Sequence, residues 1–500
     1  MIVKYLLGCD VGTTGTKTLL FTEDGKLLGH AYRAYPLLTP AVGMSEQYAE
    51  DWWKAVCETV REVVSNISDP ENVAAISLSL QGGTVVPCDG NGNALRTSIV
   101  WNDGRAAKQH AEFESEVGDP SGVYQHCGWS LGRSLPMLET RWIRDNEPEI
   151  FAKTERVLTV PSYVSMKMTG IAAADIADAG IDHFYDIRKE AYVPEYLSFA
   201  GGTEDMMPSV VRSGSMIGNL LPEAAAEMGL TEKTVLVAGA HDQYAVAVGG
   251  GANSAGDVMI GSGTAWVVTG ISDRPAFETG IAQSRAVVPG MWGSIFSLST
   301  GGVCLEWLRK QASPGADASP LGYDVINAGV AGKNPAKDGL FFYPFHGIAG
   351  TGKRFSKASF AGLDLSHDRF DMAAAVMEGV VFGTAWMMES FPSAEGQGKI
   401  RLAGGATKSA VWSQMIADIT GKTVLIPEIA DLACVGAAVI AGWGAGVYGS
   451  IEEGCRALSI RTTEMQPDPD RSAAYKAQYA AYKAMAGKLH EGYELTAGRI

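Results

Sequence analysis

The feature that most constrains the fold is a pattern of strand, glycine-rich turn and strand that occurs once in each half of the chain. Residues 2–21 contain an apolar strand, a Gly/Thr turn and a second strand, and residues 256–271 repeat this layout with a Gly-Ser-Gly-Thr turn. The chain has 500 residues, more than one hydrophobic core usually serves. We therefore expect two domains, residues 1–250 and 251–500.

Strands and helices alternate along the rest of the chain. Apolar runs at residues 26–31 and 73–80 predict strands. Residues 48–65 place apolar side chains at helical spacing and predict an amphipathic helix. The same spacing predicts further helices at residues 370–388, 408–419 and 472–489. This alternation predicts an α/β fold, in which helices cover sheets in layers.

Composition narrows the class of partner. The formal net charge is −16 and there are no basic runs, which argues against a binder of nucleic acid or of a membrane surface. No segment is expected to span a bilayer, because that takes roughly 20 apolar residues. The seven cysteines include no CxxC pair, which predicts reduced thiols and a cytoplasmic protein.

Residues 10–17, DVGTTGTK, could bind an anion and a metal ion. Asp10 ends the first strand, and the turn after it exposes the backbone N–H groups of Gly12, Thr13 and Thr14, which can cradle phosphate oxygens. Asp10 can hold a hydrated Mg²⁺ ion. An ordinary hairpin turn also favours Gly and Thr, so this segment alone leaves both interpretations open.

Two further glycine turns lie in the second half of the chain. Residues 261–264 occupy the place that corresponds to the first turn, and one such hairpin in each domain is how an actin-like cleft holds the phosphates of a nucleotide. The pair is therefore stronger evidence than either turn alone. The turn at residues 404–409 joins a strand to a helix, and its two glycines would let a planar base approach the backbone closely. A plain strand–helix turn explains the same residues.

Asp242 follows an apolar strand at residues 234–239 and precedes a run of small residues. A carboxylate at the C-terminal end of a strand is well placed to face a cleft. Phosphoryl transfer needs a base that accepts the proton of the acceptor hydroxyl, and Asp242 suits that role. The alternative is that Asp242 only caps the following helix. His241 is expected to be a hydrogen-bonded structural histidine.

Two other glycine motifs are interpreted as structural. Residues 347–353 resemble a P-loop, but Arg354 stands where Ser or Thr should bind magnesium. Gly444, Gly446 and Gly449 form a GxGxxG pattern that follows a helical stretch instead of a strand. We expect neither motif to bind a nucleotide.

Six segments, taken in order, resemble the FGGY family of carbohydrate kinases, and the resemblance covers nearly the whole chain. They are DVGTTGTK at 10–17, IVWNDGRA at 99–106, ADIADAGIDHFYD at 174–186, AGAHDQ at 238–243, GSGTAW at 261–266 and AGGATKSAVWSQMIADITGK at 403–422. Within the family, the WNDGR segment at 101–105 is most similar to the xylulokinase branch.

The resemblance implies two actin-like domains of the ribonuclease H type, with a sugar and ATP meeting in the cleft between them. It implies that Asp242 is the catalytic base and that Asp10 supports Mg²⁺ and the reacting hydroxyl. The phosphates would be held by Gly12, Thr13, Thr14, Lys17, Gly261 and Thr264, and the adenosine by Gly404, Gly405, Ala406 and Ser409. The sugar would be bound by Gln81, Gly82, Gly83, Trp101, Asp103, Arg105 and Asp242. Of these, Trp101 would form an apolar wall, and Asp103 and Arg105 would orient the sugar or brace the loop that does so.

The chain departs from the xylulokinase pattern in two places. Xylulokinases usually carry Gln-Met-His-Gly after the strand that precedes the WNDGR segment, and the Met-His pair touches the sugar; here the residues are Gln81, Gly82 and Gly83. A missing hydrogen-bond partner discriminates strongly against a polar substrate, so xylulose is not assumed. We expect the two glycines to leave space for a larger or branched acceptor. The second departure, at residues 349–355, leaves the role of that loop open.

We therefore predict an ATP-dependent kinase that phosphorylates a hydroxyl of a xylulose-like ketopentose or of a related sugar or polyol. The acceptor could also be glycerol, a tetritol or a larger sugar. The alternatives from other classes are a non-catalytic sugar-sensing regulator and an actin-fold ATPase of the chaperone or filament kind. We expect a small-molecule substrate and no nucleic-acid or membrane partner, and whether the protein forms a homodimer is open.

Overall fold

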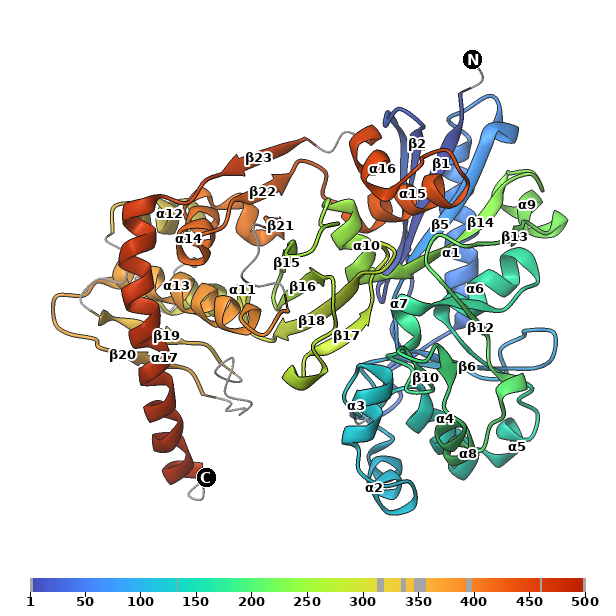
Figure 1. Cartoon of the computed structure of the whole chain (residues 1–500), viewed down its shortest axis with the longest axis horizontal. Helices are drawn as coiled ribbons and strands as arrows, with labels where there is room; N and C mark the ends of the chain where they lie inside the picture. Colours follow the sequence, from blue (N-terminus) through green and yellow to red (C-terminus); the bar gives the residue numbers. More distant parts are fainter. Residues whose placement is uncertain are drawn as a thin grey trace. The chain divides into compact units, whose positions relative to one another are not determined.

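The computed structural model describes residues 3–132, 134–312, 319–333, 339–345, 357–392, 398–458 and 461–497. The chain forms two compact units (Figure 1). Unit 1 comprises Met1–Asn253, Asp273–Ser294 and Asp431–Ile460, and unit 2 comprises Ser254–Ser272, Ile295–Ala430 and Arg461–Ile500. The domain division at residue 250 stays a prediction, and two segments beyond it, 273–294 and 431–460, group with unit 1.

The core of unit 1 is a six-stranded sheet with the order β13-β14-β5-β1-β2-β3. Its strands are β1 (Tyr5–Val11), β2 (Gly15–Thr22), β3 (Leu27–Ala34), β5 (Val73–Leu80), β13 (Met216–Asn219) and β14 (Val235–His241). β1 pairs antiparallel with β2 and parallel with β5, and β5 pairs parallel with β14. Because β1 and β5 are buried along almost their whole length, they are nearly continuous apolar runs in the sequence. The C-terminal ends of β1, β5 and β14 lie at one edge of this sheet.

Helices from distant parts of the chain cover this sheet. They include α1 (Ala49–Val64), α10 (Asp242–Gly249) and α15 (Leu432–Gly444). α15 packs on β1 and on α10, as Figure 1 shows for β1. The approach requires glycine, because a Cβ on Gly8 would lie 1.8 Å from the carbonyl oxygen of Cys434. Gly444 ends α15, so the GxGxxG pattern follows a helix, as predicted, and does not open one after a strand.

The remainder of unit 1 has a second hydrophobic core, formed largely by short helices and the small sheet β4-β7-β6-β8. The other strands of unit 1 are β4 (Glu46–Gln47), β6 (Val85–Cys88), β7 (Ser98–Ile99), β8 (Arg156–Thr159), β9 (Ala173–Asp175), β10 (Tyr185–Asp186), β11 (Ala191–Tyr192), β12 (Ser209–Val211) and β17 (Ala282–Arg285). Its other helices are α2 (Ala107–Glu116), α3 (Ser121–Cys127), α4 (Pro136–Asn146), α5 (Pro148–Phe151), α6 (Val160–Thr169), α7 (Ile176–Ala179), α8 (Pro194–Ala200), α9 (Pro222–Met228) and α16 (Ile451–Ala457).

Unit 2 repeats the central arrangement of unit 1. Five of its strands are neighbours in the order β16-β15-β21-β22-β23. They are β15 (Val258–Ser262), β16 (Trp266–Ser272), β21 (Ile400–Gly404), β22 (Val424–Pro427) and β23 (Thr462–Met465). β15 pairs antiparallel with β16 and parallel with β21, as β1 does with β2 and β5. The repeated strand–turn–strand pattern predicted from the sequence is therefore confirmed.

The helices described in unit 2 include the three predicted at residues 370–388, 408–419 and 472–489, the last of which extends beyond its predicted end, and others that were not predicted. The helices are α11 (Gly302–Gln311), α12 (Tyr323–Ala331), α13 (Arg369–Met388), α14 (Ala410–Thr420) and α17 (Pro469–Ala497), beside the small sheet of β19 (Phe341–Tyr343) and β20 (Ser359–Ala361). Among the described residues, α13 is long and apolar enough to cross a membrane, but 72% of its apolar window is buried inside the protein. It packs with β19 and with aromatic side chains of α17, as a core helix does.

Candidate active site

Two carboxylates that the sequence singled out lie at the C-terminal edge of the sheet of unit 1. Asp10 lies near the end of β1, and Asp242 begins α10 directly after β14. Ser79 of β5 pairs with Asp10, and its hydroxyl donates a hydrogen bond to Asp10 Oδ1 at 2.7 Å. Burial raises the pKa of Asp10 to about 6; the Ser79 hydrogen bond opposes this rise, and the negative charge of Asp242 adds to it. The two carboxylates therefore interact electrostatically.

Asp242 is not the cap of the helix that it begins. The N-cap of α10 is His241, whose Nδ1 accepts a hydrogen bond from the N–H of Gln243 at 3.3 Å. His241 Nδ1 also lies 3.1 Å from Asp242 Oδ1, but a nitrogen that accepts from Gln243 has no proton to donate to a carboxylate. Among the described residues Asp242 Oδ1 has no hydrogen-bond partner, and the side chain is 35% exposed. The capping alternative is wrong, and the structural interpretation of His241 is confirmed.

A chain of hydrogen bonds connects the first glycine turn to two residues expected to bind the sugar. The indole N–H of Trp101 donates to Thr13 Oγ1 at 3.0 Å, and Thr13 Oγ1 donates to Gln81 Oε1 at 3.0 Å. Gln81 Nε2 in turn donates to Gln47 Oε1 at 3.1 Å. The hydroxyl of Thr13, a residue expected to bind a phosphate, is therefore engaged within unit 1.

The turn itself has the hairpin geometry that was the alternative interpretation. The N–H of Gly12 donates to the carbonyl of Gly15 at 3.1 Å, while Thr14 is exposed. Lys17 is half-buried, and its Nζ forms a 2.8 Å ion pair with Asp431. Burial opposes the charge on Lys17, but the hydrogen bond and charge of Asp431 raise its pKa overall. Lys17 thus already has a carboxylate partner in its own unit.

Asp103 and Arg105 form an internal ion pair. Arg105 Nη2 lies 2.7 Å from Asp103 Oδ2, and Arg105 Nη1 lies 2.7 Å from Glu46 Oε1. The Asp103 carboxylate also accepts the backbone N–H groups of Ser45 and Arg105, both at 2.7 Å. Since 0% of the Asp103 side chain and 2% of the Arg105 side chain are exposed, the geometry favours bracing of the loop over contact with a sugar. Trp101, on the same loop, is 48% exposed.

The space expected at Gly82 and Gly83 is occupied. A Cβ added to Gly82 would lie 2.2 Å from Asp178 Oδ1 and 2.7 Å from His241 Cδ2. At Gly83 it would lie 2.9 Å from Leu135 Cδ2, and the φ of +68° there also favours glycine. The expectation that the two glycines leave room for a larger acceptor is therefore wrong at these two positions, because side chains from other segments fill the volume.

The sequence reasoning missed a group of buried acids in the segment 174–186. Asp175, Asp178 and Asp182 are 2%, 0% and 8% exposed. Burial raises the pKa of Asp175 to about 7, and burial together with the neighbouring carboxylates raises the pKa of Asp178 far above its ordinary value. The available signal was four aspartates, these three and the buried Asp186, in a segment otherwise rich in Ala and Ile.

Unit 2 contains a cavity of about 520 Å³, a volume typical of small-molecule sites. It joins two of the predicted turns, since Gly263 and Thr264 line it together with Gly405, Ala406 and Ser409. Ser262 connects the turns, because its hydroxyl donates to the carbonyl of Ala403 at 2.5 Å and accepts the N–H of Ala406 at 3.0 Å. Gly261 lies in β15, and Gly404 adopts a φ of +91°, which favours glycine.

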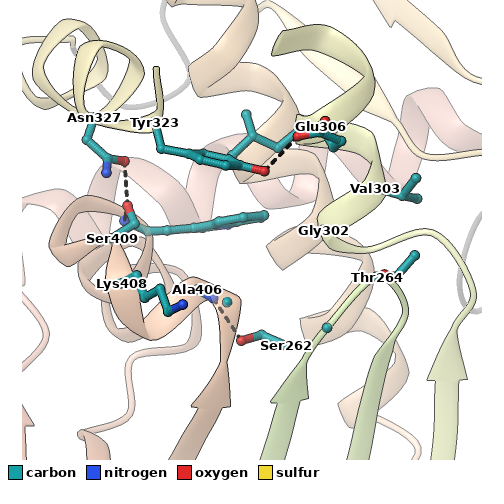
Figure 2. A pocket seen from close by; sticks show the side chains of 14 residues that line it. Ser262, Thr264, Gly302, Val303, Glu306, Tyr323, Asn327, Ala406, Lys408 and Ser409 are labelled. Carbon is teal, nitrogen blue, oxygen red and sulfur yellow. Dashed lines mark hydrogen bonds between the residues drawn. The ribbon is translucent and has the colours of Figure 1, made fainter. Parts of the chain in front are cut away.

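Three side chains at this cavity were not found from the sequence (Figure 2). The Tyr323 hydroxyl donates to Glu306 Oε2 at 2.8 Å, and Ser409 Oγ donates to Asn327 Oδ1 at 2.7 Å. Because its oxygen is occupied, the Asn327 amide has its N–H₂ group left to donate to a ligand. These residues belong to no short motif, so only the fold brings them together. The P-loop-like residues 347–353 and the loop 349–355 lie outside the described residues.

Two family models match most of the chain. The N-terminal domain of the FGGY family of carbohydrate kinases matches residues 5–249, and the C-terminal domain of that family matches residues 258–445. The chain belongs to the FGGY family of carbohydrate kinases. The resemblance seen in the sequence is confirmed, and so is the prediction of an ATP-dependent sugar kinase, since sugar kinases of this family use ATP as phosphate donor.

This FGGY kinase is similar along its full length to proteins with different acceptors. It is 29% identical to a xylulose kinase of Bacillus subtilis over 96% of each chain, and 28% identical to a gluconokinase of Bacillus licheniformis over 90% of each chain. The crystal structure of a xylulose kinase from Rhodospirillum rubrum superposes with a TM-score of 0.88 at 25% identity, over 98% of this chain and 100% of the other. The predicted two-domain, actin-like α/β fold is confirmed.

Proposed function

We propose that this FGGY kinase transfers the γ-phosphoryl group of ATP to a hydroxyl of a ketopentose of the xylulose type, or of a related sugar or polyol, with Asp242 as the catalytic base. The observation that carries the proposal is the state of Asp242. Its carboxylate is partly exposed at the end of β14, and it is not used as the cap of α10. A carboxylate that a ligand can reach is what a base needs in order to receive a proton.

In the proposed reaction Asp242 accepts the proton of the acceptor hydroxyl. A bond then forms between that oxygen and the γ-phosphorus, and the bond between the γ-phosphorus and the β–γ bridging oxygen breaks, so that ADP leaves. Little covalent chemistry is asked of the protein, because phosphoryl transfer depends mainly on positioning and on neutralisation of charge. Gln81 and Trp101 would position the acceptor, and the ion pair of Asp103 with Arg105 would hold the Trp101 loop in place.

The residues present fit a magnesium ion held jointly with ATP. In the described part of the chain no group of three or more His, Cys, Asp or Glu side chains could hold a metal alone. Mg²⁺ in kinases is usually bound by one or two carboxylates together with substrate phosphates and water. Asp10, which interacts with Asp242, is the carboxylate that we propose for this role. The ion would supply neutralisation of the phosphate charge, and a nearby cation would also favour the ionised form of Asp10.

For the nucleotide we propose the cavity of unit 2. Gly405, Ala406 and Ser409 would contact the adenosine, and Thr264 would contact the phosphates. Gly261 and Gly404 would act by keeping the two turns close. Phosphate contacts from Gly12, Thr13, Thr14 and Lys17 remain part of the proposal. The backbone N–H groups of Thr13 and Thr14 would make them directly, whereas the N–H of Gly12 would first have to give up its hydrogen bond to the Gly15 carbonyl. The Thr13 hydroxyl and the Lys17 ammonium group have protein partners already, so their side chains would have to exchange these.

The test is release of ADP, measured by a coupled assay over pentuloses, hexuloses, aldonates, pentitols, tetritols and glycerol. The wild-type protein should release ADP with at least one neutral acceptor, and Asp242→Asn should abolish the release while ATP still binds. Asp205→Asn, a change of an exposed carboxylate in unit 1, is the matched control and should be active. Near-normal turnover by Asp242→Asn would show that the base is another group. Absence of acceptor-dependent ADP release in the wild type would favour a sugar-sensing regulator.

A further inference from the structure

Asp178 lies beneath the loop Gln81–Gly83 that follows β5. It belongs to α7, the short helix after β9, and its backbone N–H donates to the Asp175 side chain at 3.1 Å. Asp178 Oδ1 occupies the volume that a side chain on residue 82 would fill, 2.2 Å from the position of its Cβ. His241, which precedes the proposed base, borders the same volume. The Asp178 carboxyl group is therefore adjacent to the proposed acceptor site.

Neither carboxyl oxygen of Asp178 has a hydrogen-bond partner in the described chain, although the residue is 0% exposed. Such a group is rare in folded proteins, since buried polar atoms are nearly always paired. Burial, with the charges of Asp182, Asp175 and Asp242, holds the pKa of this group far above its ordinary value. A raised pKa favours the protonated carboxyl group, and in that form the group donates one hydrogen bond and accepts others, as a hydroxyl does.

We propose that Asp178 is a specificity-determining residue, whose carboxyl group binds a hydroxyl of the polyhydroxy acceptor that is not the one phosphorylated. This rests on the proposed function, since it assigns a contact to the same acceptor site. Gly82, the residue of the acceptor loop that lies against the Asp178 carboxyl group, has no side chain that would have to move aside. A hydroxyl is the complementary ligand, because it can accept from the acid O–H and donate to the carbonyl oxygen.

The experiment compares one acceptor with its single-deoxy analogues. The wild type, Asp178→Ala and Asp178→Asn are assayed with the best acceptor found in the ADP-release panel and with each analogue that lacks one hydroxyl. Asp178→Ala should raise KM for the full acceptor by about 10- to 100-fold, the range for loss of one hydrogen-bond partner, with kcat changed less than about threefold. For one analogue, the wild type and Asp178→Ala should have the same KM.

Two variants separate recognition from a structural role. Asp178→Asn is neutral and similar in shape, so it should keep KM within about tenfold of the wild type, as expected when donor and acceptor atoms are retained. Asp182→Ala removes another buried acid of the same segment and should show no dependence on which hydroxyl is missing. If Asp178→Ala changes KM equally for the full acceptor and for every analogue, the residue is structural and the proposal is wrong.

Failure of the proposed function gives a different result. If the wild type turns over no acceptor, the kinase proposal fails, and calorimetry of acceptor binding replaces KM as the readout. If the loss of affinity in Asp178→Ala still depended on one hydroxyl of the acceptor, the proposed role of Asp178 would be supported. Equal binding of the full acceptor by the wild type and Asp178→Ala would overturn that role.

Discussion

Replacement of Gly82 by alanine tests how tightly the acceptor loop packs on Asp178. The added Cβ would lie 2.2 Å from Asp178 Oδ1 and 2.7 Å from His241 Cδ2. Favourable contacts between carbon atoms lie at about 3.5–4.0 Å. Neither neighbour can withdraw into solvent, because Asp178 is 0% exposed and His241 is 7% exposed. Overpacking of a buried site costs about 1–3 kcal/mol, so we expect the free energy of unfolding of Gly82→Ala to fall by that amount.

The assay is urea unfolding of Gly82→Ala beside the matched control Gly202→Ala. At Gly202 an added Cβ would meet nothing nearer than 3.8 Å, so the control should unfold as the wild type does. Adding Asp178→Ala to Gly82→Ala removes the nearest clashing atom, and the double variant should regain most of the loss through coupling of the two sites. If Gly82→Ala unfolds at the same urea concentration as the control, or if the second substitution restores nothing, the steric argument is refuted.

Two further predictions concern Asp10 and Ser262. The pKa of Asp10 is about 6 in the folded protein against an ordinary value of 3.8, so the folded protein binds this proton more tightly than the unfolded chain. The free energy of unfolding should therefore fall as the pH rises from about 4 to about 6, and Asp10→Asn should remove that part of the pH dependence in a urea series; an unchanged slope would contradict the assignment. Ser262→Ala removes the hydroxyl that connects Ala403 and Ala406, so it should weaken ATP binding in calorimetry and lower stability by about 1–3 kcal/mol. Unchanged ATP affinity would show that the two turns do not depend on this contact.

The features that local chemistry decides could be predicted from the sequence. Nearly continuous apolar runs predicted β1 and β5, and helical spacing predicted the helices α1, α13 and α14, with boundaries within a few residues. The repeat of β1–β2 by β15–β16 followed from two turns of similar composition. Asp242 at a strand end was found the same way, but the choice between base and cap needed the structure. His241 supplies the cap with a ring nitrogen, which is not among the common capping groups.

The parts that could not be predicted depend on residues far apart in the chain. Lys17 looked free to bind a phosphate because nothing near it in sequence pairs with it, yet its partner Asp431 lies 414 residues away. The surroundings of Gly82 also depend on residues far from it in the sequence. The sequence shows that Gly82 has no side chain, but it does not show which distant residue fills the volume beside it. In the fold this volume is filled by the carboxyl group of Asp178, which has no hydrogen-bond partner among the described residues. The replacement of the Met-His pair of xylulokinases by Gly82 and Gly83 therefore argues that the acceptor makes different polar contacts here. It does not argue that the acceptor is larger.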